Sequence, residues 1–356
     1  MLSRDRLLGA INRKPIDRVP MMEGYWTTTI DNWHKQGLPK SVTFEKAPEH
    51  FGQDLTAGVY VDWSFQYPAG IVEETDEYTI TISSDNVKTK TMKNSASMLE
   101  LSEYSITCRD DWEANKGRLL FNESRIDAEK AKDSFSKTRD THLQVYTEPC
   151  IGFEKFKYCM GTEGLLLAIA DDPDMIKEMT EYTLQLAIDG LEYCLGLGVE
   201  FDAALITEDM GFSNGPFFSP AFYREIIMPS HKRWNDLLHS KGMKSMLHTC
   251  GDNRKLLSCY AEIGFDVINP LEQKAGMDIY KIKKDYGDIF TLWGGIDVGT
   301  ISFGSLDELH DEIRDKVLMA KQGYGYIFGS DHSIPENVPL TTYHKMLEWG
   351  LEYGKY

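Results

Sequence analysis

The feature that most constrains the fold is a short apolar segment that recurs six times from about residue 142 onward. Each copy ends in polar residues and is followed by a helical pattern. The copies cover residues 143–148, 203–209, 245–250, 267–272, 290–297 and 326–332. Each segment is apolar through its body, as strands covered on both faces are. The repetition therefore predicts a parallel sheet covered by helices.

Capping residues mark the helices between these segments. Asp172, followed by proline, predicts the start of one helix. Ser305 and Glu308 have the spacing of a capping box, which predicts the start of another. Pro229 lies inside a third helical pattern and predicts a kink there.

Two further strands are expected earlier in the chain, at residues 19–23 and near residues 55–63. With the six later segments they make eight, which indicates an α/β fold of the (β/α)8 TIM barrel type, with residues 1–356 as one domain. Residues 77–82 and 87–92 alternate polar and apolar side chains around a polar turn, which predicts an antiparallel hairpin. We expect this hairpin in an inserted, β-rich and helical subregion at residues 70–140, after the second barrel strand.

The net charge of the chain argues against several classes of binding partner. The chain has 38 Lys and Arg against 56 Asp and Glu, a formal net charge of -18. This balance disfavours nucleic acid and anionic membranes as partners. Its start lacks the apolar core of a signal peptide, and no apolar run approaches the roughly 20 residues that span a bilayer. Six scattered cysteines show no disulfide framework, so a cytoplasmic protein with reduced thiols is expected.

Ionisable residues concentrate at the ends of the predicted strands. In a (β/α)8 barrel the active site lies at the carboxyl ends of the strands. The residues found there are Glu148, Glu208, Asp209, His248, Cys250, Glu272, Asp297, Asp331 and His332. This set predicts an active site that binds a metal ion.

His248 and Cys250 are the sharpest element of that set. Residues i and i+2 of a strand point to the same side, so an imidazole and a thiol can converge on one ion. Glu272 and His332 lie at the ends of later strands and supply two more donors. Zinc accepts nitrogen, sulfur and oxygen donors in this combination. Taken alone, the pair would more often be incidental, but its place beside Glu272 and His332 favours a zinc site.

Several segments resemble the uroporphyrinogen decarboxylase superfamily. They are His-Thr-Cys-Gly-Asp at 248–252, Gly-Phe-Asp-Val-Ile-Asn at 264–269, Trp-Gly-Gly-Ile-Asp at 293–297, Gly-Ser-Asp-His-Ser-Ile-Pro at 329–335 and Asp-Arg-Val-Pro at 17–20. Within the superfamily they are most similar to the corrinoid-dependent, zinc-containing methyltransferases. The resemblance covers nearly the whole chain and implies the same barrel fold.

The resemblance also implies a ligand set and a reaction. Those methyltransferases hold zinc by a His-x-Cys pair, a later Glu and a Cys near the last strand, which here correspond to His248, Cys250, Glu272 and, in place of the last Cys, His332. One thiolate fewer leaves the zinc more electropositive and better suited to polarise an ether oxygen. We therefore expect demethylation of a methoxylated, aromatic small molecule, with transfer of the methyl group to the Co(I) corrinoid of a separate partner protein.

Other interpretations stay open. The chain could instead move methyl groups from a corrinoid protein to a thiol or to tetrahydrofolate, act as a decarboxylase, or be a binding protein on a barrel that has lost its metal. The decarboxylase has an Arg-rich signature after the first strand, where this chain has Met-Met-Glu-Gly-Tyr-Trp. The oligomeric state is not fixed by the sequence, and a homodimer is one option.

Each remaining candidate site residue could have a structural role instead of a functional one. Glu208 and Asp209 could act as an acid and base pair or cap loops, and Asp331 could be catalytic, orient a metal ligand or cap a helix. Tyr25, Trp26 and Trp293 could line a substrate pocket together with Glu148, although aromatic residues near strands more often belong to the core.

Overall fold

A curled, seven-stranded parallel sheet forms the centre of the molecule. The computed structural model describes residues 1–93, 100–147 and 150–356. The strands run in the order β1 (Thr56–Val59), β6 (Leu143–Thr147), β7 (Ala203–Thr207), β10 (Lys244–His248), β11 (Val267–Asn269), β12 (Thr291–Trp293) and β13 (Tyr326–Ile327). All six strands predicted from residue 143 onward are therefore confirmed, and β1 confirms the strand expected near residues 55–63.

The two edges of the sheet meet at residues 20–22. The backbone N–H of Phe328, just after β13, donates to the carbonyl of Pro20 at 2.8 Å. On the other side, the N–H of Asp54, just before β1, donates to the carbonyl of Met21 at 2.8 Å. The expected strand at 19–23 is thus reduced to one β-bridge, between Met21 and Phe328, because Pro20 has no N–H to extend the ladder. The curled sheet and its helices are consistent with a TIM-like barrel.

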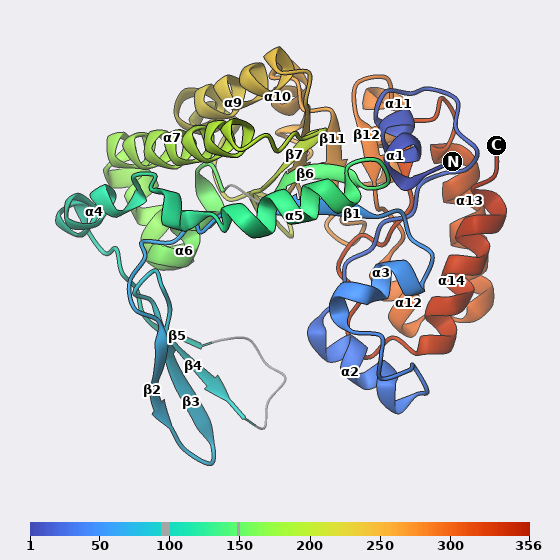
Figure 1. Ribbon diagram of the computed structural model, residues 1–356, viewed down its shortest axis with the longest axis horizontal. Coiled ribbons are helices and arrows are strands. Elements are labelled where there is room, and N and C mark those ends of the chain that lie inside the picture. The colour runs from blue at the N-terminus through green and yellow to red at the C-terminus, as the bar shows by residue number, and fades with distance from the viewer. Residues whose placement is uncertain (94–99, 148–149) are drawn as a thin grey trace.

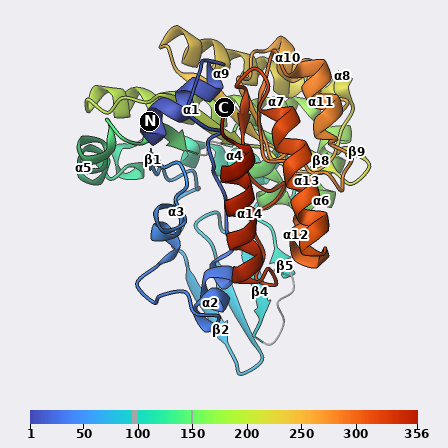
Figure 2. The same cartoon turned by 90° about the vertical axis from the view of Figure 1, so that its right-hand side faces the viewer.

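Helices cover the outside of this sheet (Figures 1 and 2). The helices of the described residues are α1 (Ser3–Ile11), α2 (Thr27–Lys35), α3 (Ala47–His50), α4 (Arg109–Asn115), α5 (Ala128–Thr138), α6 (Phe153–Asp171), α7 (Pro173–Gly196), α8 (Pro220–Phe222), α9 (Met228–Ser240), α10 (Leu257–Glu262), α11 (Ile279–Tyr286), α12 (Val298–Phe303), α13 (Leu306–Ala320) and α14 (Leu340–Tyr353). Short 3-10 turns are η1 (Phe44–Lys46), η2 (Lys116–Leu119) and η3 (Glu123–Arg125), and η4 (Tyr223–Ile227) is a π-helical turn.

The predicted helix signals are found where they were expected. The Asp172 side chain accepts from the N–H of Met175 and caps α7. Ser305 and Glu308 form the capping box of α13. Pro229 is the second residue of α9, and the π-helical turn η4 lies just before this helix, between α8 and α9.

Helix α1 closes the amino-terminal end of the sheet. Its apolar residues Leu7, Ala10 and Ile11 are buried in one cluster with the first residues of several strands, including Leu143 and Val267. The β12 residue Thr291 donates its hydroxyl to the carbonyl of Ala10 at 3.2 Å. The opposite, carboxyl end of the strands is therefore the end at which a site can form.

A separate antiparallel sheet projects from this body (Figure 1). It consists of β2 (Gly70–Glu74), β3 (Tyr78–Ile82), β4 (Lys88–Met92) and β5 (Glu100–Glu103), in that order. Strands β3 and β4 are the predicted hairpin, and the sheet follows β1 in the chain, as expected. The buried Lys155 of α6 forms an ion pair with Asp85 of the β3–β4 turn and so ties this sheet to the body.

No helix in the described part of the chain is both long enough and apolar enough to cross a membrane.

Candidate functional site

Three metal-binding side chains meet at the ends of β7 and β10. These strands are parallel neighbours with Thr207 opposite His248, so the residues two positions further on, Asp209 and Cys250, also lie side by side. The donor atoms of Asp209, His248 and Cys250 all lie within 4.8 Å of one another. His248 Nε2 is 3.5 Å from Cys250 Sγ and 3.7 Å from Asp209 Oδ1. We call these three residues the donor cluster.

The orientation of the His248 ring is fixed by Asn269 at the end of β11. His248 Nδ1 is 2.6 Å from Asn269 Oδ1, and Asn269 Nδ2 donates to the carbonyl of Trp293 at 3.2 Å. A carbonyl can only accept, so the amide nitrogen must face Trp293 and the amide oxygen must face the imidazole. His248 therefore carries its proton on Nδ1 and presents the lone pair of Nε2 to the donor cluster.

The turn after Cys250 is held by carboxylates. Asp209 Oδ1 accepts from the N–H of Cys250 at 3.0 Å, and Glu272 Oε2 accepts from the N–H of Gly251 at 2.8 Å. Gly251 has a φ of 80°, a conformation that favours glycine. A hairpin of β8 (Gly211–Phe212) and β9 (Gly215–Pro216) packs on this turn, where a Cβ on Gly211 would lie 2.5 Å from the carbonyl oxygen of Cys250.

The electrostatics of the donor cluster favour a cation. Burial raises the pKa of the Cys250 thiol, and the carboxylates of Asp209 and Glu272 raise it further. A thiolate at this position therefore needs a positive charge beside it, which a bound metal ion would supply. Zinc bonds of about 2.0–2.3 Å in a tetrahedron place neighbouring donors about 3.3–3.7 Å apart, which fits the two separations from His248 Nε2.

Two predicted ligands, Glu272 and His332, lie outside the donor cluster. Among the described residues, neither Glu272 nor His332 belongs to the group of donors within 4.8 Å. Glu272 instead accepts from Gly251, next to Cys250. His332 lies in a cavity wall, with its ring centroid 6.2 Å from that of Trp26. Asp209, predicted as a catalytic residue, is the carboxylate that joins the histidine and the cysteine.

A cavity of about 340 Å³ opens at this end of the strands, and we call it the mouth cavity. Its lining consists of Glu23, Gly24, Leu205, Thr207, His248, Asn269, Pro270, Trp293, Ser330, His332 and Ser333. It thus contains His248, its partner Asn269, and His332. A molecule bound in this cavity would contact the imidazole of the donor cluster.

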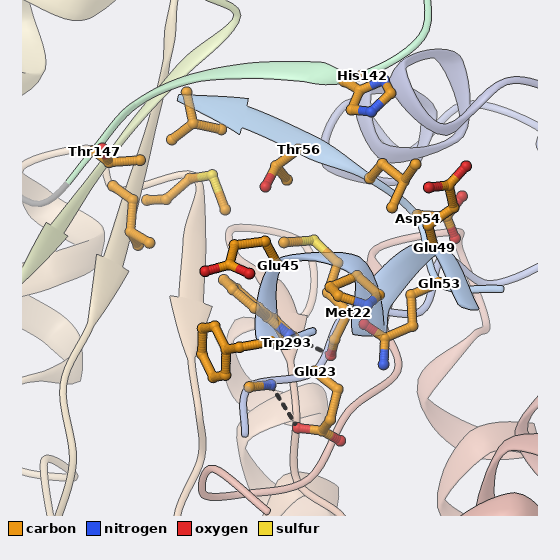
Figure 3. A pocket seen from close by; sticks show the side chains of 17 residues that line it. Met22, Glu23, Glu45, Glu49, Gln53, Asp54, Thr56, His142, Thr147 and Trp293 are labelled. Carbon is orange, nitrogen blue, oxygen red and sulfur yellow. Dashed lines mark hydrogen bonds between the residues drawn. The ribbon is translucent and has the colours of Figure 1, made fainter. Parts of the chain in front are cut away.

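A second cavity of about 510 Å³ adjoins the first and reaches between residues 22–24 and β1; we call it the side cavity. Its residues are Met22, Glu23, Gly24, Phe44, Glu45, Pro48, Glu49, Gln53, Asp54, Leu55, Thr56, His142, Val145, Thr147, Leu205, Met246 and Trp293. Figure 3 shows Glu23 and Trp293 next to each other on its wall. The two cavities share Glu23, Gly24, Leu205 and Trp293, so they meet at these residues.

The charge of these cavities restricts their ligands. None of the described residues that line them is a lysine or an arginine, whereas Glu23, Glu45, Glu49 and Asp54 are acidic. A ligand with several carboxylates would meet repulsion here without a cationic partner. The cavities therefore suit a neutral or cationic small molecule.

Glu23 is a site residue that was expected among the acids around the site but was given no catalytic or ligand role. Its Oε2 accepts from the N–H of Ser330 at 2.8 Å, and its Oε1 is 2.7 Å from the Ser330 hydroxyl oxygen. Burial raises the pKa of this carboxyl group to about 8. Its place at the end of the expected strand at 19–23 was the signal that could have suggested such a role.

Two predicted catalytic acids are turned towards the backbone. Glu208 is completely buried, and its Oε2 accepts from the N–H of Glu154 in the first turn of α6 at 2.8 Å. Burial raises the pKa of this carboxyl to about 8. The two oxygens of Asp331 accept from the N–H groups of Val298 and Gln273, at 2.8 and 2.7 Å. Asp331 therefore anchors the loop that carries Glu272.

The three aromatic residues predicted to bind substrate lie in three different environments. Trp293 lines both cavities and donates Nε1–H to the carbonyl of Met22 at 3.2 Å. Trp26 is exposed beside His332. Tyr25 points into the core, where its hydroxyl is 2.7 Å from that of Tyr343, so its placement differs from the expected pocket position. Glu148 lies outside the described residues.

Comparison with known proteins gives two findings. The model of the family described as uroporphyrinogen decarboxylase (URO-D) matches residues 153–353. Among solved structures, a methyltransferase from Methanosarcina mazei superposes with a TM-score of 0.64 over 99% of both chains, at 15% sequence identity. At that identity the likeness concerns the fold. No curated protein sequence matches this chain.

Proposed function

The chain belongs to the uroporphyrinogen decarboxylase family, and we propose that within this family it is a zinc-dependent methyltransferase. In this proposal it demethylates a methoxylated, aromatic small molecule and passes the methyl group to the Co(I) corrinoid of a separate protein. The observation that carries the proposal is the donor cluster of Asp209, His248 and Cys250 beside a cavity without lysine or arginine among its described residues.

The lack of lysine and arginine in the described cavity lining argues against a second candidate function, the decarboxylation of a polycarboxylate. A site for such a substrate needs arginines or lysines to pair with its carboxylates. The described lining of the side cavity offers the exposed carboxylates of Glu45 and Glu49 instead. A neutral methyl ether avoids the repulsion that these acidic residues would exert on an anion.

The donor cluster fits zinc in its chemistry. Asp209, His248 and Cys250 would hold the ion, and Glu272 lies next to them through its bond to Gly251. A zinc ion bound there supplies a Lewis acid for the oxygen of a methyl ether. Only one thiolate is available among these residues, as the sequence suggested, and this favours ether activation over binding of a nucleophilic thiolate.

The protein's own residues would bind and orient the substrate. His248 is held by Asn269 so that Nε2 faces the donor cluster, and Trp293 offers an aromatic wall next to it. The apolar side chains of Met22, Leu205 and Met246 continue this wall into the side cavity. An aromatic ring placed against them would leave its methoxy group near the mouth, where a large partner can reach the methyl carbon.

The experiment that tests the proposal uses zinc-loaded protein, a reduced corrinoid protein and a panel of methoxylated aromatics, methylamines and methyl thiols. We expect the methyl-Co(III) absorbance to rise with at least one methoxylated aromatic. Cys250→Ser should bind less zinc and lose this signal, whereas Cys108→Ser, at an exposed cysteine, should keep both. Full activity of zinc-free protein, or a response to a methyl thiol and to no ether, would overturn the proposal.

A further inference from the structure

Glu23 lies on the wall that the mouth cavity and the side cavity share. In the mouth cavity the same wall includes His248 of the donor cluster and Trp293. A substrate that reaches from the aromatic wall towards the donor cluster therefore passes the carboxyl group of Glu23.

The hydrogen bonds of Ser330 determine the protonation state of Glu23. The Ser330 hydroxyl oxygen is within hydrogen-bond distance of two oxygens, Glu23 Oε1 at 2.7 Å and the carbonyl oxygen of His332. A hydroxyl group has one hydrogen, and a carbonyl can only accept. The Ser330 hydrogen therefore goes to His332, and the hydrogen between Ser330 and Glu23 must come from Glu23. Glu23 is thus a carboxylic acid with its proton on Oε1.

The surroundings of Glu23 agree with this proton count. Burial raises its pKa to about 8, and the nearby carboxylate of Asp331 contributes in the same direction. The N–H groups of Ser330 and Gly24 donate to its two oxygens and hold the carboxyl group in place. At neutral pH the cavity wall therefore contains a protonated carboxyl group that can donate its proton.

We propose that Glu23 is the general acid that protonates the leaving oxygen when a methyl ether is cleaved in the mouth cavity. This inference rests on the proposed function. The electron pair of a Co(I) nucleophile forms the new bond to the methyl carbon, and the C–O pair stays on the oxygen. The proton moves from Glu23 Oε1 to that oxygen, which gives a phenol and leaves Glu23 as a carboxylate that solvent reprotonates. No external oxidant or reductant enters this step.

The other acids near the site are less suited to this role. Asp331 and Glu208 accept from backbone N–H groups and are not among the described residues that line the mouth cavity. Asp209 is bonded to the N–H of Cys250 within the donor cluster. Of these four acids, Glu23 is the one that lines the mouth cavity.

The test compares two aryl methyl ethers that differ in the acidity of the phenol released, anisole and 4-nitroanisole, with cob(I)alamin as the methyl acceptor. In Glu23→Gln we expect demethylation of anisole to fall about 100-fold or more, the usual contribution of a general acid. Demethylation of 4-nitroanisole should fall by only a few fold, because 4-nitrophenolate leaves without a proton. Glu23→Asp, which keeps an acid, should recover part of the anisole rate.

Glu129→Gln is the matched control, since that glutamate is exposed on α5. It should leave both rates unchanged. Equal losses for the two ethers in Glu23→Gln, or no loss for either, would overturn the inference. Thermal unfolding of each variant separates a loss of the acid from a loss of the fold.

A second readout does not depend on activity. Infrared spectra at neutral pH should show the carbonyl band of a protonated carboxylic acid that is weaker in Glu23→Gln than in the wild type. The absence of any difference would contradict the protonated state of Glu23. If the wild type demethylates neither ether and no other methoxylated aromatic, the proposed function fails, while this band still reports on Glu23.

Discussion

Asn269 shows how a single side chain outside the donor cluster can decide what the cluster binds. It accepts from His248 Nδ1, and its own orientation is set by the carbonyl of Trp293. Without it, the imidazole could rotate or place its proton on Nε2, where a metal ion needs a lone pair. In the proposed zinc site the amide would therefore act on the metal through the histidine.

We expect Asn269→Leu to lower the affinity for zinc by about 10- to 100-fold, the usual effect of losing such a partner. Asn269→Asp, which can still accept from Nδ1, should lose less. Competition with a chromophoric chelator measures the affinity without any substrate. An unchanged affinity in Asn269→Leu, in a variant with wild-type thermal unfolding, would contradict the role of this amide.

The buried His231 of α9 predicts a loss of stability in acid. Its Nε2 donates to the carbonyl of Ile151 at 2.9 Å, its Nδ1 accepts from the Tyr223 hydroxyl at 2.9 Å, and burial lowers its pKa to about 4. The unfolded chain takes up this proton near pH 6.5. His231 therefore destabilises the fold progressively between pH 6.5 and pH 4, by about 3 kcal/mol at most.

Urea unfolding at several pH values tests this prediction. The free energy of unfolding of His231→Gln should fall less between pH 6.5 and pH 4 than that of the wild type. His344→Gln, at an exposed histidine of α14, should follow the wild type. The same pH dependence in His231→Gln and in the wild type would show that another group is responsible.

The sequence could indicate His248 and Cys250 because the two-residue period of a strand puts them on one side. It could also place Asp209 and Asp331 at strand ends. The sequence could not predict that Asp209 contacts Cys250, whereas Asp331 binds backbone N–H groups. These choices depend on the register between strands and on loop paths, which the pattern of apolar residues does not encode. Asn269 went unassigned for the same reason.

At the scale of elements, the β8–β9 hairpin controls the shape of the turn that carries Cys250. Gly211 of the hairpin packs directly on the backbone of Cys250 and Gly251, and the N–H of Asp252 donates to the carbonyl of Phe212 at 2.8 Å. Backbone atoms cannot move aside as a flexible side chain can. The hairpin and the turn must therefore fit each other closely.

We expect Gly211→Ala to weaken zinc binding, because its Cβ would lie 2.5 Å from the carbonyl oxygen of Cys250 and displace the turn. Gly196→Ala is the matched control, since nothing lies within 4 Å of a Cβ at that position near the end of α7. Zinc content after dialysis and thermal unfolding would be measured together. Retention of stoichiometric zinc in Gly211→Ala would contradict this account.

Regular elements were predictable from the sequence where their patterns were long. The apolar segments predicted six strands, and Asp172 and Ser305 predicted the starts of α7 and α13. The four-stranded sheet is larger than the predicted hairpin because β2 and β5 lack a clear alternating pattern. The segment at 19–23 forms one bridge rather than a strand because Pro20 has no N–H to extend the ladder, a limit that its apolar pattern alone did not indicate.

At the scale of the whole molecule, an ion-pair network joins the two edges of the sheet. The side chain of Asp54 is fully buried and pairs with Arg6 of α1 and with Arg18, which is 2.8 Å away. Its Oδ2 also accepts from the N–H of Met21 at 2.9 Å. One carboxylate thus connects α1, the segment at 20–22 and the start of β1.

We expect Asp54→Ala to lower the free energy of unfolding by about 3–5 kcal/mol, because it leaves two guanidinium groups with a missing partner in a buried place. Asp76→Ala, in the exposed β2–β3 turn, should change it little. Chemical unfolding of both variants gives the comparison. A small effect at Asp54 would contradict this account and would leave the backbone hydrogen bonds of residues 20–22 and helix packing to hold the two edges together.

The side cavity also has a consequence for kinetics. Its outer wall includes the exposed residues Phe44, Glu45 and Glu49, and its lining continues to Asp54 at the amino end of β1, away from the carboxyl ends of the strands. A large partner seated over those ends would leave this outer wall uncovered. The small molecule and the partner would then have separate routes of arrival and departure, and neither would have to wait for the other. Steady-state rates should accordingly follow a random order of addition, in which the small molecule is exchanged while the larger complex persists.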